Sequence, residues 1–141
     1  MEEAKCYATE IENKLSGEDT EIFLREIGKT DIENWSNNLS KKDRWSYILS
    51  SFTRMRYLKN DGSMDWKQKG RVLDNPDLIP WFRYNGKIID KKIVFGHWAS
   101  LGLYLSPNVI GLDSGCVWGN KLTIVRLDNM KITQVECDNL S

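Results

Sequence analysis

Apolar residues recur at helical spacing near the start of the chain. They fall three or four positions apart until Ser16-Gly17 interrupts the pattern, and they are Ala4, Tyr7, Ala8, Ile11 and Leu15. This spacing predicts an amphipathic helix that ends near Leu15. The following run, DTEIFLREIG, opens with acidic residues and closes at Gly28. It predicts a second, shorter helix, with Gly28 as the residue that ends it.

The clearest helical pattern lies in SKKDRWSYILSSF. Ser40 precedes Asp43 by three positions, which resembles a capping box at a helix start. The apolar positions that follow have i, i+3, i+4 and i+7 spacing and are Trp45, Ile48, Leu49 and Phe52. The sequence therefore predicts a third helix that begins after Ser40 and buries this apolar stripe.

From the third helix onward the pattern indicates strands and turns. Asp61-Gly62 separates two β-compatible runs in TRMRYLKNDGSMDWKQ, which predicts a hairpin. Arg54 and Arg56 are two positions apart on its first arm, so we expect both on one face of the sheet. The run DNPDLIPWFRYNG is interrupted by prolines and predicts an irregular connection.

Two further strands are predicted in KIIDKKIVFGH and NVIGLDSG, and the second is apolar enough to be covered on both faces. The last part of the chain predicts strands joined at Gly119-Asn120 and Asp128-Asn129. No internal repeat or domain boundary is visible. We therefore expect one domain over residues 1–141, of α/β (α+β) class, with N-terminal helices followed by a mainly antiparallel or mixed sheet.

Composition narrows the classes of partner. The 141 residues include twenty basic and twenty acidic side chains, so no net charge favours nucleic acid or an anionic membrane surface. No run is long enough to span a membrane, and MEEAKCYATE lacks the apolar core of a signal peptide. Cys6, Cys116 and Cys137 form no CxxC pattern, which favours reduced thiols. We expect a soluble cytoplasmic protein with a small-molecule or protein partner.

Two residues at predicted strand ends are candidates for binding chemistry. His97, the only histidine, follows an apolar strand and a glycine, and Asp113 ends the next strand. Such positions gather ligands in α/β proteins, and the carboxylate could orient the imidazole. The alternatives are a structural or merely exposed histidine and an Asp-Ser-Gly turn in which Asp113 caps its own backbone.

Other residues carry weaker signals. Arg54 and Arg56 present guanidinium groups that suit phosphate oxygens, although exposed arginines are commonly solvated or paired with acids. Cys116 follows a glycine beside Val117 and Trp118, which favours an inert buried thiol over a nucleophile. The six tryptophans are expected to line the core and any pocket, with base stacking as a further role for one or two.

Five motifs together resemble a known family. They are ENWSNN, FTRMRY, PWF, IVFGHWASL and VIGLDSGCVWGNKLTIVRL, and their order and approximate spacing resemble those of the C-terminal half of symmetrical bis(5′-nucleosyl)-tetraphosphatases. This family belongs to the calcineurin-like metallophosphoesterases. The resemblance runs from the first helix to about residue 127. It implies that the chain is a partial domain, the C-terminal half of a metallophosphoesterase sandwich.

The resemblance also implies a function. These hydrolases cleave diadenosine tetraphosphate symmetrically into two ADP, with two divalent metal ions, often manganese or cobalt, that clamp a phosphate and activate the attacking water. His97 matches the last histidine ligand of that centre. The resemblance further implies that Arg54 and Arg56 contact substrate phosphates and that Asp113 supports His97 through a hydrogen bond that orients the imidazole. It also implies that Trp98 lines the nucleotide side of the pocket.

The remaining metal-binding motifs of the family, in its first half, do not occur in this chain. One ligand is too few to hold a metal ion, so we do not expect this chain alone to retain one. Two expectations follow. The chain is part of a dinucleoside tetraphosphate hydrolase that works together with the missing N-terminal half, or it is a non-catalytic product of a split or decayed gene, or a binding module.

Overall fold

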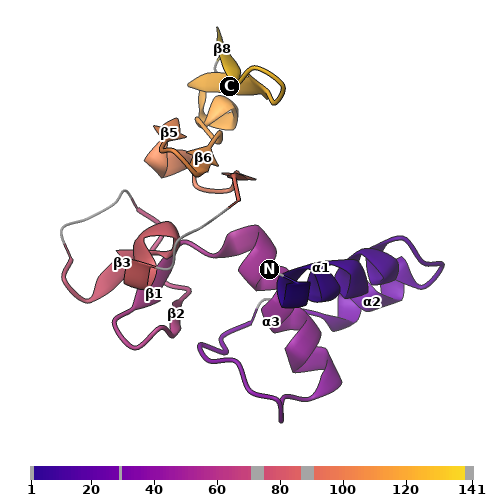
Figure 1. Ribbon diagram of the computed structural model, residues 1–141. Helices are drawn as coiled ribbons and strands as arrows, with labels where there is room; N and C mark the ends of the chain where they lie inside the picture. Colours follow the sequence, from indigo (N-terminus) through magenta and orange to yellow (C-terminus); the bar gives the residue numbers. More distant parts are fainter. Residues whose placement is uncertain (1, 29, 71–74, 87–90, 139–141) are drawn as a thin grey trace.

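Helices come first and strands follow, as the sequence predicts. The computed structural model describes residues 2–28, 30–70, 75–86 and 91–138. Within them, α1 (Glu2–Leu15), α2 (Thr20–Glu26) and α3 (Lys41–Arg54) form a helical layer at the start of the chain (Figure 1). The strands that follow form three small sheets. The α+β class is therefore confirmed.

The helix ends follow local chemistry. Ser40 is the N-cap of α3: its Oγ accepts a hydrogen bond from the Asp43 amide at 3.1 Å and donates one to Asp43 Oδ2 at 2.7 Å. The predicted start of α3 is confirmed, because this side chain pairs an amide that the helix leaves unsatisfied. The end of α2 lies where the sequence predicts, with Gly28 at the C′ position, but without the left-handed conformation usual there. The helix stops at Glu26 with extended Ile27 as its C-cap, and Gly28 does not adopt a positive φ.

The helical layer has its own apolar core. Ile11, Phe23, Ile27 and Ile48 are buried together, with partly buried aromatic rings packed around them. A polar clamp joins α1 to α3, in which the Glu10 carboxylate accepts hydrogen bonds from Arg44 and from Trp45 Nε1, the latter at 2.7 Å. Phe52 departs from the predicted buried stripe, because it lies beyond this core near the end of α3 and is 53% exposed.

The first sheet contains β1 (Tyr57–Lys59), β2 (Met64–Asp65) and β3 (Leu78–Pro80), all antiparallel, in the order β2-β1-β3. The predicted hairpin at Asp61-Gly62 is confirmed, and Gly62 takes a φ of 87° that favours glycine.

Two expectations about this region are wrong. The run around Pro80 is not irregular: it forms β3 and then the 3₁₀ helix η1 (Trp81–Gly86). Pro80 is tolerated because β3 is an edge strand. Arg54 and Arg56 do not share a strand face either, because α3 continues through Arg54 and β1 begins only at Tyr57. Helical hydrogen bonding therefore prevails over the β-compatible pattern in this segment.

The second sheet is mixed. It contains β4 (Ile93–Phe95), β5 (Tyr104–Leu105) and β6 (Val109–Gly111), with β4 parallel and β5 antiparallel to the central β6. All three residues of β6 are buried, which confirms that this strand is covered on both faces. A short 3₁₀ helix, η2 (Ala99–Leu101), connects β4 to β5. Residues 87–90 of the predicted strand lie outside the described residues.

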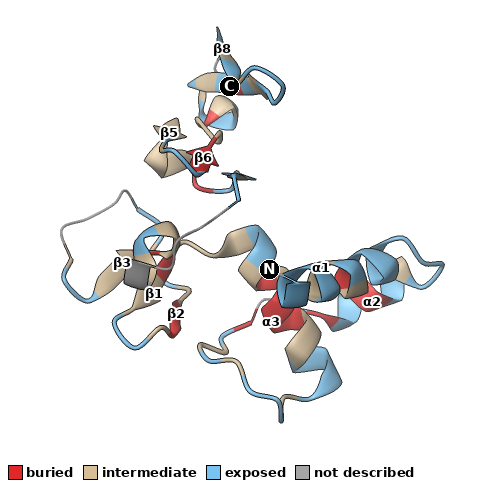
Figure 2. Ribbon diagram, viewed as in Figure 1, coloured by how far each residue is buried: buried red, intermediate tan, exposed pale blue. Residues whose placement is uncertain are grey.

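The third sheet is the hairpin of β7 (Lys121–Arg126) and β8 (Lys131–Glu136), whose turn contains Asp128-Asn129 as predicted. Gly119-Asn120 instead joins the 3₁₀ helix η3 (Cys116–Trp118) to β7. The hairpin lies at the opposite end of the molecule from α1 and α2 (Figure 1). Buried residues gather between the helices, in β1 and in β6, whereas the hairpin is mostly exposed (Figure 2).

The expectation of three reduced thiols is wrong for two of them. Cys116 and Cys137 form a disulfide, and Cys6 is free and exposed. The sequence gives no sign of the pair because the two residues are 21 positions apart. The β7–β8 hairpin returns the chain to η3, where the Cys137 amide donates to the Asn120 carbonyl at 2.8 Å. Cys116 is thus neither a buried thiol nor a nucleophile in this structure.

None of the helices within the described residues combines the length and the apolar character that crossing a membrane requires.

Candidate phosphate and metal site

The site begins where two parallel strands end. In the pairing of β4 with β6, Phe95 lies opposite Gly111, and the Leu112 amide donates to the Phe95 carbonyl at 2.9 Å. His97 and Asp113 each follow two positions beyond that pair. The parallel register therefore brings the two predicted site residues to the same edge of the sheet, where open α/β sheets bind ligands.

His97 has an unusual backbone conformation. Its φ is 65°, in the left-handed region, and its side chain is exposed. This conformation costs a residue with a Cβ about 1–2 kcal/mol. A Cβ at Gly96 would lie 4.0 Å from the Asp113 Cβ, an ordinary van der Waals contact, so the two loops lie side by side. The chain thus turns sharply at His97 and presents the imidazole at the surface.

Arg56 joins the helical layer to this edge. Its Nη2 donates a hydrogen bond to the backbone carbonyl of His97 at 2.8 Å. Arg54, the last residue of α3, is close enough for its charge to act on both Arg56 and His97. The four predicted residues Arg54, Arg56, His97 and Asp113 therefore meet, although the reason given for the arginines, a shared strand face, is wrong.

Electrostatics favour the neutral imidazole. Burial lowers the pKa of His97, the charges of Arg56 and Arg54 lower it further, and Asp113 opposes them. Neutral imidazole is the form that binds metal ions. Burial and the neighbouring Arg54 also lower the pKa of Arg56, which indicates a crowded positive site suited to an anion.

One donor in this cluster lacks a partner. Arg56 Nε is buried and has no hydrogen-bond acceptor within the described part of the chain. A buried unpaired donor costs about 1–3 kcal/mol. A phosphate oxygen is the acceptor that a guanidinium fork matches best. The unpaired Nε is therefore an unsatisfied donor within a positively charged cluster.

Asp113 has the local role that the sequence left open. Its Oδ1 accepts a hydrogen bond from the Gly115 amide at 3.2 Å, as in an Asx turn, and Gly115 has a φ of 77°. The structure shows no hydrogen bond between the carboxylate and the His97 imidazole among the described residues. Asp113 thus caps its turn while its charge faces the histidine.

A cleft of about 660 Å³ opens beside the cluster. Its walls come from the end of α3, from η1 and from β4 with its following loop, and they consist of residues 4, 51–55, 81 and 93–97. Sequence reasoning missed Phe52, Trp81 and Phe95 as lining residues, because no motif marks them and only the approach of α3 to β4 brings them together.

Trp98 does not line this cleft, contrary to expectation. Its side chain is 2% exposed, its Nε1 donates to the Gly70 carbonyl at 3.1 Å, and its ring packs edge-on against Tyr57 at 4.8 Å. Trp98 instead anchors the loop that carries His97.

Metal ligands are few in the cluster. Among the residues that the structure describes, no three His, Cys, Asp or Glu side chains lie close enough to hold a metal ion. His97 and Asp113 supply one nitrogen and one carboxylate at the sheet edge. Of these, only the imidazole is a predicted ligand, and Asp113 Oδ1 already accepts from the Gly115 amide, so the described residues do not complete a metal centre.

Known proteins resemble this chain in sequence. The chain matches no protein-family model. It is 41% identical over 139 residues to the symmetrical bis(5′-nucleosyl)-tetraphosphatase of Nitrosomonas europaea, covering 97% of this chain and 52% of that protein. The proteins of the same name from Aromatoleum aromaticum and Vibrio parahaemolyticus are 41% and 37% identical, over 95% and 94% of this chain and 50% of each relative.

The chain thus spans about half the length of the curated relatives it matches. The resemblance to the C-terminal half of this family that the sequence motifs predict is confirmed for a chain of that extent. Nearly the whole of this chain is homologous to about half the length of each of these symmetrical bis(5′-nucleosyl)-tetraphosphatases, so the chain belongs to that family.

Proposed function

We propose that this chain is the C-terminal half of a metal-dependent hydrolase that cleaves diadenosine tetraphosphate symmetrically into two ADP. The observation that carries the proposal is the meeting of His97, Asp113, Arg54 and Arg56 at one sheet edge, with a buried guanidinium donor left open. The names of the relatives support the same reaction for the proteins that contain both halves.

The residues of this chain have distinct parts in the proposed reaction. His97, held neutral by its surroundings, would bind one metal ion, and Asp113 would hold the imidazole in an orientation suited to that ion by its charge. Arg56 Nε and the Arg54 guanidinium would bind phosphate oxygens. Their positive charge would offset the negative charge that develops as water adds to phosphorus and one ADP leaves.

Divalent ions, with manganese or cobalt proposed, would supply the polarisation of the phosphate and the activation of the attacking water. The described residues of this chain offer too few ligands to keep them bound. We therefore propose that residues 1–141 are one partial domain of a calcineurin-like sandwich and that the missing N-terminal half is its partner. A cytoplasmic location, testable by cell fractionation, forms part of the same proposal.

The accessible surface supports an incomplete domain. It measures 9843 Å² for a mass of 16.4 kDa, whereas a folded monomer of that mass exposes about 7,500 Å². Several large apolar side chains are among the exposed residues, including Leu122, Ile124, Leu127 and Val135. Such surface is what a second half would cover.

The second candidate function is a non-catalytic module or a decayed fragment. The small number of metal ligands among the described residues favours it. In that case the chain would keep its sheets and its anion cluster without the hydrolytic reaction.

Reconstitution separates the two. Manganese-dependent release of ADP from diadenosine tetraphosphate is measured for the chain alone, for the N-terminal half of the Nitrosomonas europaea relative alone, and for their mixture. We expect activity only in the mixture, and we expect His97→Ala to abolish it. An inactive mixture of folded halves would favour the non-catalytic candidate, and equal activity with His97→Ala would refute the ligand assignment.

A further inference from the structure

A second, smaller pocket adjoins the cleft at His97. It has a volume of about 290 Å³ and lies between α1, α3 and the segment that carries Trp35. Ala4, Ser51 and Phe52 line both this pocket and the cleft that contains Arg54 and His97. The two hollows therefore lie side by side and share these three residues.

The smaller pocket is aromatic. The Tyr7 and Trp35 ring centroids are 5.3 Å apart, and those of Trp35 and Tyr47 are 5.6 Å apart. Phe52, 53% exposed, stands where the pocket meets the cleft. Stacking on such rings is the usual way in which proteins hold a nucleobase without reading its sequence context.

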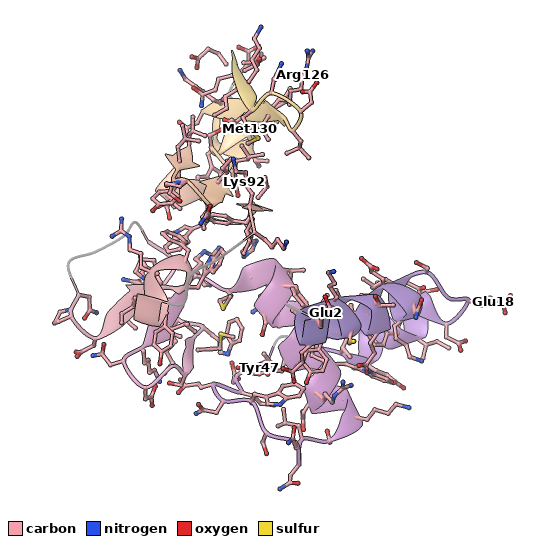
Figure 3. All side chains as sticks on the ribbon, in the orientation of Figure 1. Glu2, Glu18, Tyr47, Lys92, Arg126 and Met130 are labelled. Atoms are coloured by element: carbon pink, nitrogen blue, oxygen red, sulfur yellow. A yellow bond between two sulfur atoms is a disulfide. The ribbon has the colours of Figure 1, made fainter. Side chains whose placement is uncertain are left out.

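A carboxylate lies among these rings. Glu3 also lines the pocket, and its Oε1 accepts a hydrogen bond from the Tyr7 hydroxyl at 2.8 Å. A carboxylate has further lone pairs, so Glu3 can also accept from the exocyclic amine of a purine. Glu2 and Tyr47, labelled in Figure 3, mark the start of α1 and the face of α3 between which this pocket lies.

The spacing along α3 relates this pocket to the phosphate end. Tyr47 and Arg54 are seven positions apart in one helix, which places them on the same face about 10 Å apart along the axis. Ser51 lies between them and lines both hollows. This distance is comparable with the reach of a nucleoside diphosphate from its base to its terminal phosphate.

We infer that the aromatic pocket between α1 and α3 binds the purine nucleoside of a nucleotide whose phosphates lie at Arg54 and His97. This inference rests on the proposed function, because it takes the phosphate end from it. Another depression, of about 700 Å³ beside Trp118, is less suited because it shares no lining residue with the cleft.

The test measures the affinity of the 141-residue chain for three probes, adenosine, inorganic diphosphate and ADP, by calorimetry. Phe52→Ala removes the ring at the junction, and Ala4→Leu fills the shared wall from the exposed side of α1. We expect Phe52→Ala, which removes one stacked ring, to weaken adenosine and ADP about tenfold. Ala4→Leu should weaken both probes by filling the pocket, and neither change should affect diphosphate.

Matched controls lie on the same helical layer. Leu24→Ala removes an exposed apolar side chain on α2, and Thr9→Leu adds one on α1, and neither residue lines the pocket or the cleft. Both should bind all three probes as the unmodified chain does. Circular dichroism of each variant checks that the helices remain folded.

Arg54→Gln separates this inference from the proposed function. We expect it to weaken diphosphate and ADP but not adenosine. Adenosine binding that depends on Phe52 while Arg54→Gln changes nothing would support the nucleoside pocket and contradict the phosphate site. ADP binding that depends on Arg54 but is unchanged by Phe52→Ala and Ala4→Leu would overturn the inference alone. Loss of adenosine binding on addition of the N-terminal half would also overturn it, because polypeptide would then fill the pocket.

Discussion

The Arg56 guanidinium donates from Nη2 to the backbone carbonyl of His97 at 2.8 Å, while Nε of the same side chain has no acceptor among the described residues. The guanidinium group therefore holds the sharply turned loop that presents the imidazole, and it leaves one buried donor unpaired. The structural part of the site and its proposed anion-binding part meet in this one side chain.

Replacement of Arg56 by lysine should separate these parts. Lysine keeps the positive charge but lacks the planar fork, so it cannot hold the His97 carbonyl and a phosphate oxygen together. We expect the affinity for inorganic diphosphate to fall about tenfold. Arg126→Lys, on exposed β7, is the matched control and should leave the affinity unchanged. Equal binding by both variants would count against the role of the fork.

The backbone at His97 allows its chemistry to be distinguished from its strain. Because φ is 65°, alanine is strained at this position and glycine is not. The free energy of unfolding of His97→Gly should therefore be about 1 kcal/mol larger than that of His97→Ala. Both variants should lack hydrolysis in the reconstituted enzyme. Chemical denaturation gives the stability difference, and no difference would mean that the loop does not hold this conformation in solution.

The pH dependence of stability should report on His97. Its pKa is lowered in the folded state by burial and by Arg56 and Arg54, so the unfolded chain binds the proton more readily. The free energy of unfolding should therefore fall as the pH drops below the ordinary histidine pKa of about 6.5. The fall should level off below the folded-state pKa, and the stability should be regained when the pH is raised again. Since His97 is the only histidine, His97→Asn should flatten this window.

The Glu10 clamp should stabilise the helical layer. Glu10→Gln weakens the hydrogen bonds from Arg44 and Trp45. We expect chemical denaturation to show a free energy of unfolding that is about 1–2 kcal/mol smaller. Hydrogen bonding from Arg44 is the first cause that lowers the pKa of Glu10. The contribution of the carboxylate is therefore complete above its unfolded pKa and is lost as the pH falls through the folded value. Glu12→Gln, exposed on α1, is the control.

The disulfide should tie the C-terminal hairpin to η3. It joins residues that are 21 positions apart. Closing a loop of that length lowers the entropy of the unfolded chain and should stabilise the folded state by about 3 kcal/mol. Reduction, or Cys116→Ser with Cys137→Ser, should increase hydrogen exchange in β7 and β8 and leave α1 to α3 unchanged. Cys6→Ser, at the free exposed cysteine, should have no effect. Unchanged exchange in the hairpin after reduction would show that the strand pairing alone holds it.

Local sequence signals determined much of the fold. Helical spacing and the Ser40 cap specify α1 and α3, and turn pairs at Asp61-Gly62 and Asp128-Asn129 specify two hairpins. These features depend on neighbours a few positions away, which is why a single sequence reveals them. The same sequence pointed to His97 and Asp113 because both follow apolar strands, and the resemblance in its motifs indicated the family.

Only the tertiary structure decided the rest, because it depends on which distant segments meet. The parallel register of β4 with β6 sets His97 beside Asp113, and the length of α3 decides that Arg54 is helical and that Arg56 reaches the His97 carbonyl. The disulfide and the aromatic pocket arise in the same way. Contacts over tens of residues leave no periodic trace along the chain, so packing alone reveals them.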